Sequence, residues 1–186
     1  MWCSMEQKIN FKKIIDDNLE LAVSIQNEIF PDEDGRENFI ECVEHNPYRK
    51  ELDFYIAYDG DLPIGVTGVY SYHEYPDDAW LGWFGILPNL RCKGYGNKVL
   101  DMTIDMARDK GYKNLRLYSD ESFVDAHRLY KSKGMIQEIY DNPDDKDPYE
   151  PEGLKTYIFS ISLNDEKVKL WNNKTLGLKE QGMKER

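Results

Sequence analysis

The chain has 186 residues, with 35 acidic and 24 basic side chains and a formal net charge of −11 at pH 7. A domain of this size buries enough surface to fold without a disulfide or a structural metal. The acidic balance argues against a nucleic-acid partner, and no apolar run has the roughly 18 residues of a membrane span. Cys3, Cys42 and Cys92 are widely spaced and the start does not resemble a secretory signal, so we expect a cytoplasmic protein.

The first part of the chain predicts a strand, two helices and a β-hairpin. In chain order these are a strand over 9–15, a helix that begins after Asn18 and stops before Pro31, a helix over 36–45, and strands over 52–58 and 64–72. In the first helix Leu21, Ile25 and Ile29 recur every four residues, which predicts its buried face. Asp59-Gly60 between the two strands is a typical hairpin turn.

An uninterrupted apolar run over 79–87 predicts a central strand that is covered on both faces. Gly82 and Gly85 within this run suggest a bulge or a close approach of another backbone. Helices and strands then alternate. They are a helix over 96–110, a strand over 114–119, a helix over 122–133, strands over 135–140 and 155–163, and, as one interpretation of the tail, a short strand over 168–171.

This order of elements predicts the fold class. A strand–helix–strand crossover over 79–119 implies a parallel pair, whereas the hairpin implies an antiparallel one. We therefore expect an α/β (α+β) fold: a mixed, mostly antiparallel central sheet with a central parallel pair, flanked by helices.

The segment from Ile86 to Gly96 carries the strongest chemical signal. A buried strand leads into a loop with Gly94 and Gly96, where a helix begins. A helix start offers unpaired N–H groups and the positive end of a dipole, which suit a phosphate or pyrophosphate. Three basic side chains add positive charge: Arg91, Lys93 and Lys98. An ordinary strand-to-helix turn is the alternative; the P-loop motif is absent, and Val99 replaces the third glycine of a dinucleotide fingerprint.

Two motifs resemble the GNAT superfamily of N-acetyltransferases. The string Arg91-Cys92-Lys93-Gly94-Tyr95-Gly96 is similar to the family's acyl-CoA pyrophosphate loop, Q/R-x-x-G-x-G/A, and Ile86-x-Pro88 is similar to the strand end before it. The string Ala126-x-x-x-Tyr130-Lys131-x-x-Gly134-Met135 is similar to the family's A-x-x-x-Y-x-K-x-G-F helix. The chain has Met135 where the family usually has Phe. It has Phe123 where the family often has an Asn that contacts pantetheine, and Ser122 and Asp125 are the candidates to replace that contact.

The resemblance implies the GNAT (acyl-CoA N-acyltransferase) fold over residues 1–163, with a C-terminal extension over 164–186. It implies direct transfer of an acetyl group from acetyl-CoA to a primary amine. The residues that it implies for cofactor binding are Phe84, Gly85, Ile86, Arg91, Cys92, Lys93, Gly94, Tyr95, Gly96, Asn97 and Lys98. No metal is expected, because the chain has no C-x-x-C pair and its three histidines do not cluster.

By the same resemblance, Tyr130 is the predicted general acid for the leaving thiolate, and a backbone N–H near Ile86 would polarise the thioester carbonyl. Glu74 is the predicted general base. Other carboxylates that we consider for this role are Asp78, Asp120 and Glu121, and each of the four can equally be a solvated loop residue. His127 either caps the site or faces water, and direct transfer needs no nucleophilic cysteine.

Two loops that usually border the acceptor site in this family, over 30–36 and 141–152, are acidic here, and the second also contains Tyr149. Carboxylates attract cations, so we expect a small cationic amine such as a polyamine, an aminoglycoside or a basic peptide end. An acidic surface that only confers solubility is the alternative. The alternative acceptor is a protein or peptide amine, and the alternative function is an acyl-CoA-binding sensor or a decayed subunit. We expect a monomer or homodimer with no nucleic-acid or membrane partner.

Overall fold

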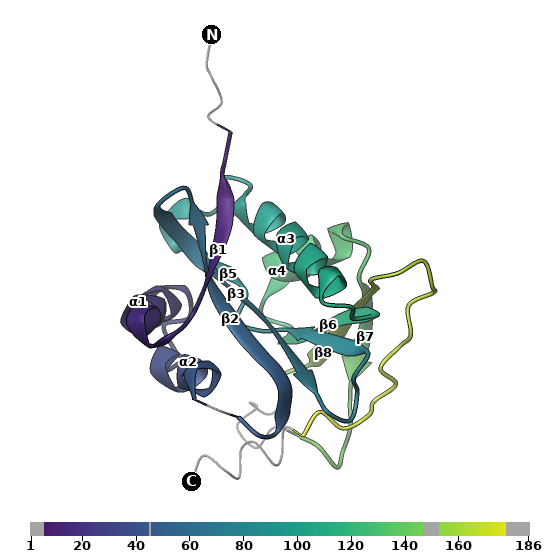
Figure 1. Ribbon diagram of the computed structural model, residues 1–186. Helices are drawn as coiled ribbons and strands as arrows, with labels where there is room; N and C mark the ends of the chain where they lie inside the picture. The colour runs from purple at the N-terminus through teal and green to yellow at the C-terminus, as the bar shows by residue number, and fades with distance from the viewer. Residues whose placement is uncertain (1–5, 45, 147–152, 178–186) are drawn as a thin grey trace. The chain divides into compact units, whose positions relative to one another are not determined.

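The computed structural model describes residues 6–44, 46–146 and 153–177, in two compact units, Met1–Lys113 and Asn114–Arg186 (Figure 1). Cys3, His45, Tyr149 with the rest of 147–152, and the end of the predicted extension over 178–186 lie outside the described residues. Within the described ranges, no helix is both long enough and apolar enough to cross a bilayer.

The first unit is an antiparallel sheet with helices on both faces. Its strands are β1 (Ile9–Lys13), β2 (Arg49–Asp59), β3 (Leu62–Tyr72), β4 (Asp78–Leu81) and β5 (Gly85–Ile86). Its helices are α1 (Leu19–Ile29), α2 (Gly35–Val43) and α3 (Tyr95–Asp109), with short 3-10 turns η1 (Asp16–Asn18) and η2 (Pro88–Leu90). Strands β1, β2, β3 and β4 pair in that order, and β5 pairs with β3 further along.

Helices α2 and α3 cover opposite faces of this sheet. Phe39 of α2 packs on Phe54 of β2, with ring centroids 5.6 Å apart. On α3, Thr103 shares a 2.8 Å hydrogen bond with Thr67 of β3. The register partner of Thr67 is Tyr55, the residue after Phe54, and successive strand residues point to opposite sides. Figure 1 accordingly shows α1 and α2 together on one side of β1–β3 and α3 on the other.

The predicted strand over 79–87 is not continuous, because a bulge divides it into β4 and β5. Leu81 faces Val69 and Gly85 faces Val66, so three steps along β3 are matched by four on the bulged strand. The bulge suggested by the two glycines of this run is therefore confirmed. The hairpin turn predicted at residues 59–60 is also confirmed, since β2 and β3 pair directly across it.

The predicted buried face of α1 is partly wrong, because Leu21 is 41% exposed. The residues of α1 that are buried are Leu19, Ala22, Ile25, Gln26 and Ile29. A spacing of four residues drifts around a helix that has 3.6 residues per turn, so a strict i, i+4 series leaves the buried face after a few steps.

The second unit is a three-stranded antiparallel sheet in the order β6, β8, β7. Its elements are β6 (Asn114–Asp120), α4 (Val124–Ser132), β7 (Ile136–Tyr140) and β8 (Thr156–Ser162). Helix α4 covers one face, where His127 packs on Phe159 with ring centroids 4.8 Å apart. The tail covers the opposite face, because Arg116 of β6 donates to the hydroxyl of Ser160 at 2.8 Å and to the carbonyl of Lys169 at 2.6 Å.

The short strand predicted over 168–171 is absent from this described part of the tail. The N–H groups of Trp171 and Asn172 instead donate to the carboxylate of Glu138 on β7, at 2.8 and 3.0 Å. Because a side chain satisfies these donors, the segment does not pair with a strand. Trp171 and Leu176 are buried, 1% and 3% exposed, so these two side chains attach the described part of the tail to the second unit.

Candidate active site

The start of α3 is an open turn that presents backbone donors. Gly94, its N-cap residue, has a φ of +83°, and Cys92 has a φ of +59°. A Cβ built on Gly94 would have no heavy atom within 4 Å, so the space beside this turn is open. The first-turn N–H groups, those of Tyr95, Gly96 and Asn97, have no carbonyl partner within the helix. The turn can therefore receive an anion directly against its backbone.

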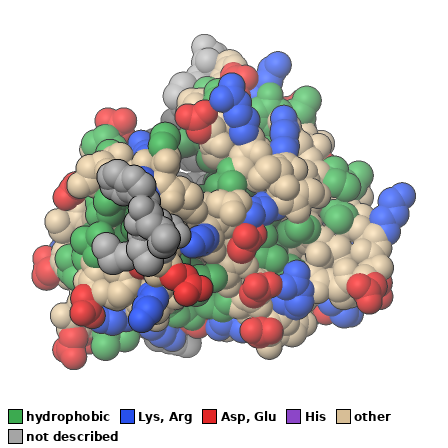
Figure 2. Space-filling model, turned by 90° about the horizontal axis from the view of Figure 1, so that it is seen from above, with side chains coloured by type: hydrophobic (Ala, Val, Ile, Leu, Met, Phe, Trp, Pro, Cys, Tyr) green, Lys and Arg blue, Asp and Glu red, His purple; other side chains and the backbone are tan. Residues whose placement is uncertain are grey.

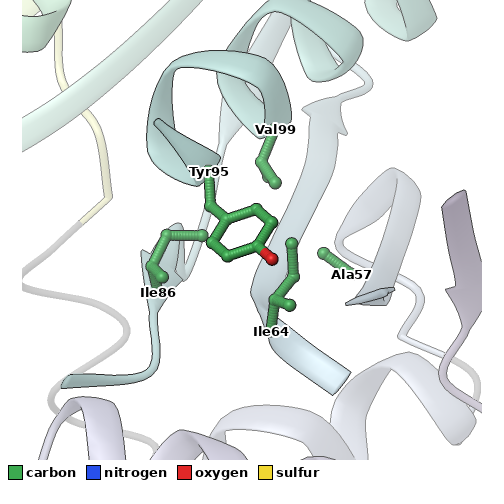
Figure 3. Close-up of a cluster of buried hydrophobic side chains, with 5 residues drawn as sticks. All are labelled: Ala57, Ile64, Ile86, Tyr95 and Val99. Atoms are coloured by element: carbon green, nitrogen blue, oxygen red, sulfur yellow. The ribbon is translucent and has the colours of Figure 1, made fainter. Parts of the chain in front are cut away.

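Tyr95 fixes the position of this helix start. Its ring points from the first turn of α3 into a cluster formed by Ala57, Ile64, Ile86 and Val99 (Figure 3). Its hydroxyl donates to the carboxylate of Asp59 at 2.8 Å, and this hydrogen bond raises the pKa of Tyr95. The Tyr95 side chain therefore belongs to the core, and only its backbone is directed to the loop.

Basic and polar side chains surround the turn. The exposed ones are Arg91, Cys92, Lys93, Asn97 and Lys98, and the first turn of α3 contains no acidic residue. Arg91 Nε donates to the carbonyl of Ile86 at 3.1 Å, which ties its guanidinium to the end of β5. Over the face drawn in Figure 2, acidic and basic side chains are interspersed, so the net charge of −11 does not form one continuous acidic field there.

The bulge before this loop depends on close packing against its glycines. A Cβ on Gly82 would lie 2.9 Å from the ring of Phe54, and a Cβ on Gly85 would lie 2.4 Å from Cγ2 of Ile29. Phe84 between them is half-buried and packs on the Tyr95 cluster. The strand end predicted to hold the thioester is thus held rigidly beside the helix start.

In the second unit, the motif helix α4 presents a buried tyrosine and a buried histidine. Tyr130 is 6% exposed, its ring centroid lies 5.3 Å from that of Phe159, and burial raises its pKa well above the ordinary value. His127 Nε2 lies 3.0 Å from the hydroxyl of Ser119 on β6. Burial lowers the pKa of His127, and the charge of Lys131 lowers it further. The ring of His127 packs between α4 and β8, so the alternative that it faces water is wrong.

The four candidate bases lie in different settings. Glu74 is exposed on the turn after β3, whereas Asp78 is buried at the start of β4. Asp120 accepts from the backbone N–H of Ser122 at 2.8 Å, and Glu121 accepts from the backbone N–H of Lys155 at 3.2 Å. The last two carboxylates therefore stabilise loops of the second unit. Among the described residues no group of three or more His, Cys, Asp or Glu side chains is arranged to hold a metal ion.

The two acidic loops also contain structural carboxylates. Asp34 caps α2, since its side chain accepts from the N–H groups of Arg36 and Glu37. In the second loop Asp145 is 3% exposed and accepts from the hydroxyl of Tyr140 at 2.7 Å. Phe123, at the position of the family's usual asparagine, is 43% exposed.

Sequence reasoning missed two supports of the loop. The sequence pattern indicates only a turn at Asp59, but its carboxylate accepts hydrogen bonds from the Tyr95 hydroxyl and from the backbone N–H of Lys8. Gln7 Nε2 donates to the carbonyl of Lys93 at 3.1 Å. All three contacts join residues far apart in the chain, and no local pattern signals them.

Several solved structures have the same fold as this chain. The ribosomal-protein-S18-alanine N-acetyltransferase from Escherichia coli aligns over 88% of this chain and 99% of its own, with 17% identity and a TM-score of 0.67. A GNAT family acetyltransferase from Elizabethkingia anophelis with acetyl-CoA bound aligns over 84% and 99%, with 15% identity and a TM-score of 0.63. The spermidine/spermine N-acetyltransferase SpeG from Vibrio cholerae aligns over 83% and 94%, with 13% identity and a TM-score of 0.61. At these identities the likeness establishes the fold alone.

The predicted fold class is confirmed: a mixed α/β fold whose sheet is mostly antiparallel, contains one parallel pair and is flanked by helices. No curated protein sequence matches the chain. The model of the acetyltransferase (GNAT) family matches residues 16–135, which include the α3 loop and the Tyr130 helix. The chain therefore belongs to the GNAT family of acetyltransferases.

Proposed function

We propose that this chain transfers the acetyl group of acetyl-CoA directly to the primary amine of a small cationic acceptor. The observation that carries the proposal is the open start of α3, where left-handed Gly94 and the first-turn N–H groups adjoin a bulged strand. Backbone donors at this turn would hold the pyrophosphate, with Arg91, Lys93 and Lys98 as its exposed cations. That the GNAT structure from Elizabethkingia anophelis contains acetyl-CoA supports the same cosubstrate.

When bound, acetyl-CoA supplies the acetyl group: the amine nitrogen bonds to the thioester carbon, the carbon–sulfur bond breaks, the sulfur leaves as thiolate, and the amine loses a proton. A backbone N–H near Ile86 is the proposed donor to the thioester carbonyl. Tyr130 Oη is the proposed source of the proton for the thiolate, the role its motif implies. Burial raises the pKa of Tyr130, which keeps the phenol protonated but also makes it a weaker acid, so the proposed role depends on its position in the motif.

Glu74 is the proposed base. It follows β3, which ends at Tyr72, whereas Gly85 pairs with Val66 in the middle of that strand. Six strand residues span roughly 20 Å, so Glu74 would reach an amine near Gly85 only through a chain of several waters, which is longer than the single water of ordinary general-base catalysis. In the first unit, the exposed carboxylates of Asp32 and Glu33 are the proposed groups that attract a cationic acceptor. Asp34 is not counted with them, because its carboxylate caps α2.

The test is an acetyl-CoA assay over a library of small amines and short peptides, at two ionic strengths. We expect free thiol and an acetylated small amine in equal amounts, with KM rising at higher salt. Acetylation of peptides alone would replace the acceptor with a protein or peptide amine. Binding of acetyl-CoA without thiol release from any amine would contradict the proposal and favour a sensor or decayed subunit.

Tyr130→Phe tests the proposed acid. We expect kcat to fall about a hundredfold, because a phenylalanine has no proton to give to the thiolate. The affinity for acetyl-CoA, measured by calorimetry, is the control and should stay within twofold. An unchanged kcat between pH 6 and 10 would remove Tyr130 from the chemistry.

A further inference from the structure

Trp83 has an unusual backbone conformation in the bulge between β4 and β5. Its φ is +45°, in the left-handed region, where a bulky side chain is strained. The nearby positions 82 and 85 are glycines, so this segment already uses glycine where packing requires it. A tryptophan at position 83 is more costly than glycine would be, which indicates a use for its indole.

The end of α1 holds this indole in place. Phe30 follows α1 directly, and its ring meets that of Trp83 edge-on, with centroids 5.6 Å apart and an interplanar angle of 68°. This is a favourable geometry for an aromatic pair. A Cβ on Gly85 would lie 3.3 Å from the Phe30 ring, so the glycine lets Phe30 approach the bulge closely. The two rings therefore form a fixed aromatic pair beside the strand end.

Trp83 differs from the other described tryptophans. Trp80 and Trp171 are 0% and 1% exposed and belong to the cores of their units, whereas Trp83 is only half-buried. Part of its surface is thus accessible at the bulge. Asp32 and Glu33, which are exposed, follow Phe30 within three residues. The backbone N–H of Glu33 donates to the carbonyl of Phe30 at 3.1 Å, so this acidic segment is adjacent to the aromatic pair.

On the basis of the proposed function, we infer that Trp83 and Phe30 select the carbon skeleton of the acceptor, which is an alkyl or arylalkyl primary amine. Trp83 directly precedes the strand end proposed for the thioester, so a skeleton packed on the indole places its nitrogen next to that strand end. The ring buries the apolar part of the amine. The ring face and the nearby carboxylates attract the ammonium before it is deprotonated. The bonds made and broken are those of the acyl transfer described above.

The experiment compares four amines at saturating acetyl-CoA: phenethylamine, hexylamine, ethanolamine and spermidine. We expect the parent chain to have a kcat/KM for the first two at least about tenfold above that for ethanolamine. Trp83→Ala should reduce this ratio about tenfold, mainly through KM, and Trp83→Phe should preserve most of it. Tyr48→Ala removes an aromatic side chain that is 65% exposed elsewhere in the first unit, and it should leave the ratio unchanged.

Two different failures can be told apart. A parent chain that prefers ethanolamine or spermidine, or a Trp83→Ala variant that slows all four amines equally, would overturn this inference while acetyl transfer stands. A parent chain that binds acetyl-CoA and acetylates no amine would overturn the proposed function. Trp83→Gly removes the indole and also the strain of the positive φ, because glycine adopts this conformation freely. If Trp83→Ala does not fold, Trp83→Gly should fold and should show the same loss of selectivity.

Discussion

The starts of α2 and α3 both have backbone N–H groups without a partner inside the helix. In α2 a side chain of the protein accepts from them, whereas in α3 the N-cap residue has no side chain that can do so. In α2 the carboxylate of Asp34 accepts from the N–H groups of Arg36 and Glu37, at 2.9 and 3.2 Å. In α3 the N-cap is Gly94, which has no side chain to make such a bond. A helix start is therefore not an anion site by itself, because its own cap can fill it. The α3 start is available because glycine leaves the donors open.

The largest expected effect comes from giving α3 the cap that α2 has. Gly94→Asp would put a carboxylate where the pyrophosphate is proposed to bind. We expect the affinity for acetyl-CoA to fall about a hundredfold, since charge-assisted hydrogen bonds are lost and a like charge is added. Isothermal titration calorimetry measures this change.

Gly111→Asp is the matched control for that variant. Gly111 follows the other end of α3, has a φ of +88°, and a Cβ there would have no neighbour within 4 Å. The substitution causes roughly the same backbone strain, about 25 Å away at the opposite end of the helix. Equal losses of affinity in both variants would show that strain, and not the donors of the α3 start, explains the effect.

The reverse change removes the cap of α2. Asp34→Ala should lower the free energy of unfolding by about 1 kcal/mol, because the N–H groups of Arg36 and Glu37 lose their acceptor. Its affinity for acetyl-CoA should not change. Urea denaturation measures the stability, and Asp32→Ala in the same loop is the control, expected within about 0.5 kcal/mol of the parent. A weaker acetyl-CoA affinity in Asp34→Ala would mean that the two helix starts are not independent.

The smallest expected effect concerns pH. The α3 start is proposed to bind acetyl-CoA through N–H groups that do not titrate, so the acid sensitivity of the fold should arise elsewhere. Burial lowers the pKa of His127, and Lys131 lowers it further, while Asp120 opposes both. The unfolded chain then binds more protons than the fold below pH about 6.5. The stability contribution of neutral His127 is complete above that pH and is lost as pH falls.

His127→Gln should therefore reduce the slope of unfolding free energy against pH between 7 and 5. Lys131→Met, which removes only the neighbouring charge, should reduce it partly. Denaturant titrations at several pH values measure both slopes. A slope that is unchanged in His127→Gln would assign the acid sensitivity to other groups.

Local patterns in the sequence were sufficient for most elements and for the α3 loop. The alternation of polar and apolar residues, the hairpin turn at Asp59-Gly60 and the glycines at 94 and 96 act within a few residues. Leu21 was misplaced because the series of four residues ignores helical drift. The bulge was suggested by Gly82 and Gly85, but its extra residue appears only in the register with β3.

The sequence by itself determined the mixed fold, the glycine loop at the start of α3 and the membership in an acetyltransferase family, because these depend on residues adjacent in the chain. Only the tertiary structure decided what holds that loop, namely Tyr95 on Asp59 and Arg91 on Ile86. The tertiary structure also decided which carboxylates cap a helix or hold a loop. It alone placed Trp83, with its left-handed backbone, in the bulge against Phe30. The physical reason is that hydrogen bonds and ring contacts between distant residues depend on strand register and burial, which no short stretch of sequence specifies.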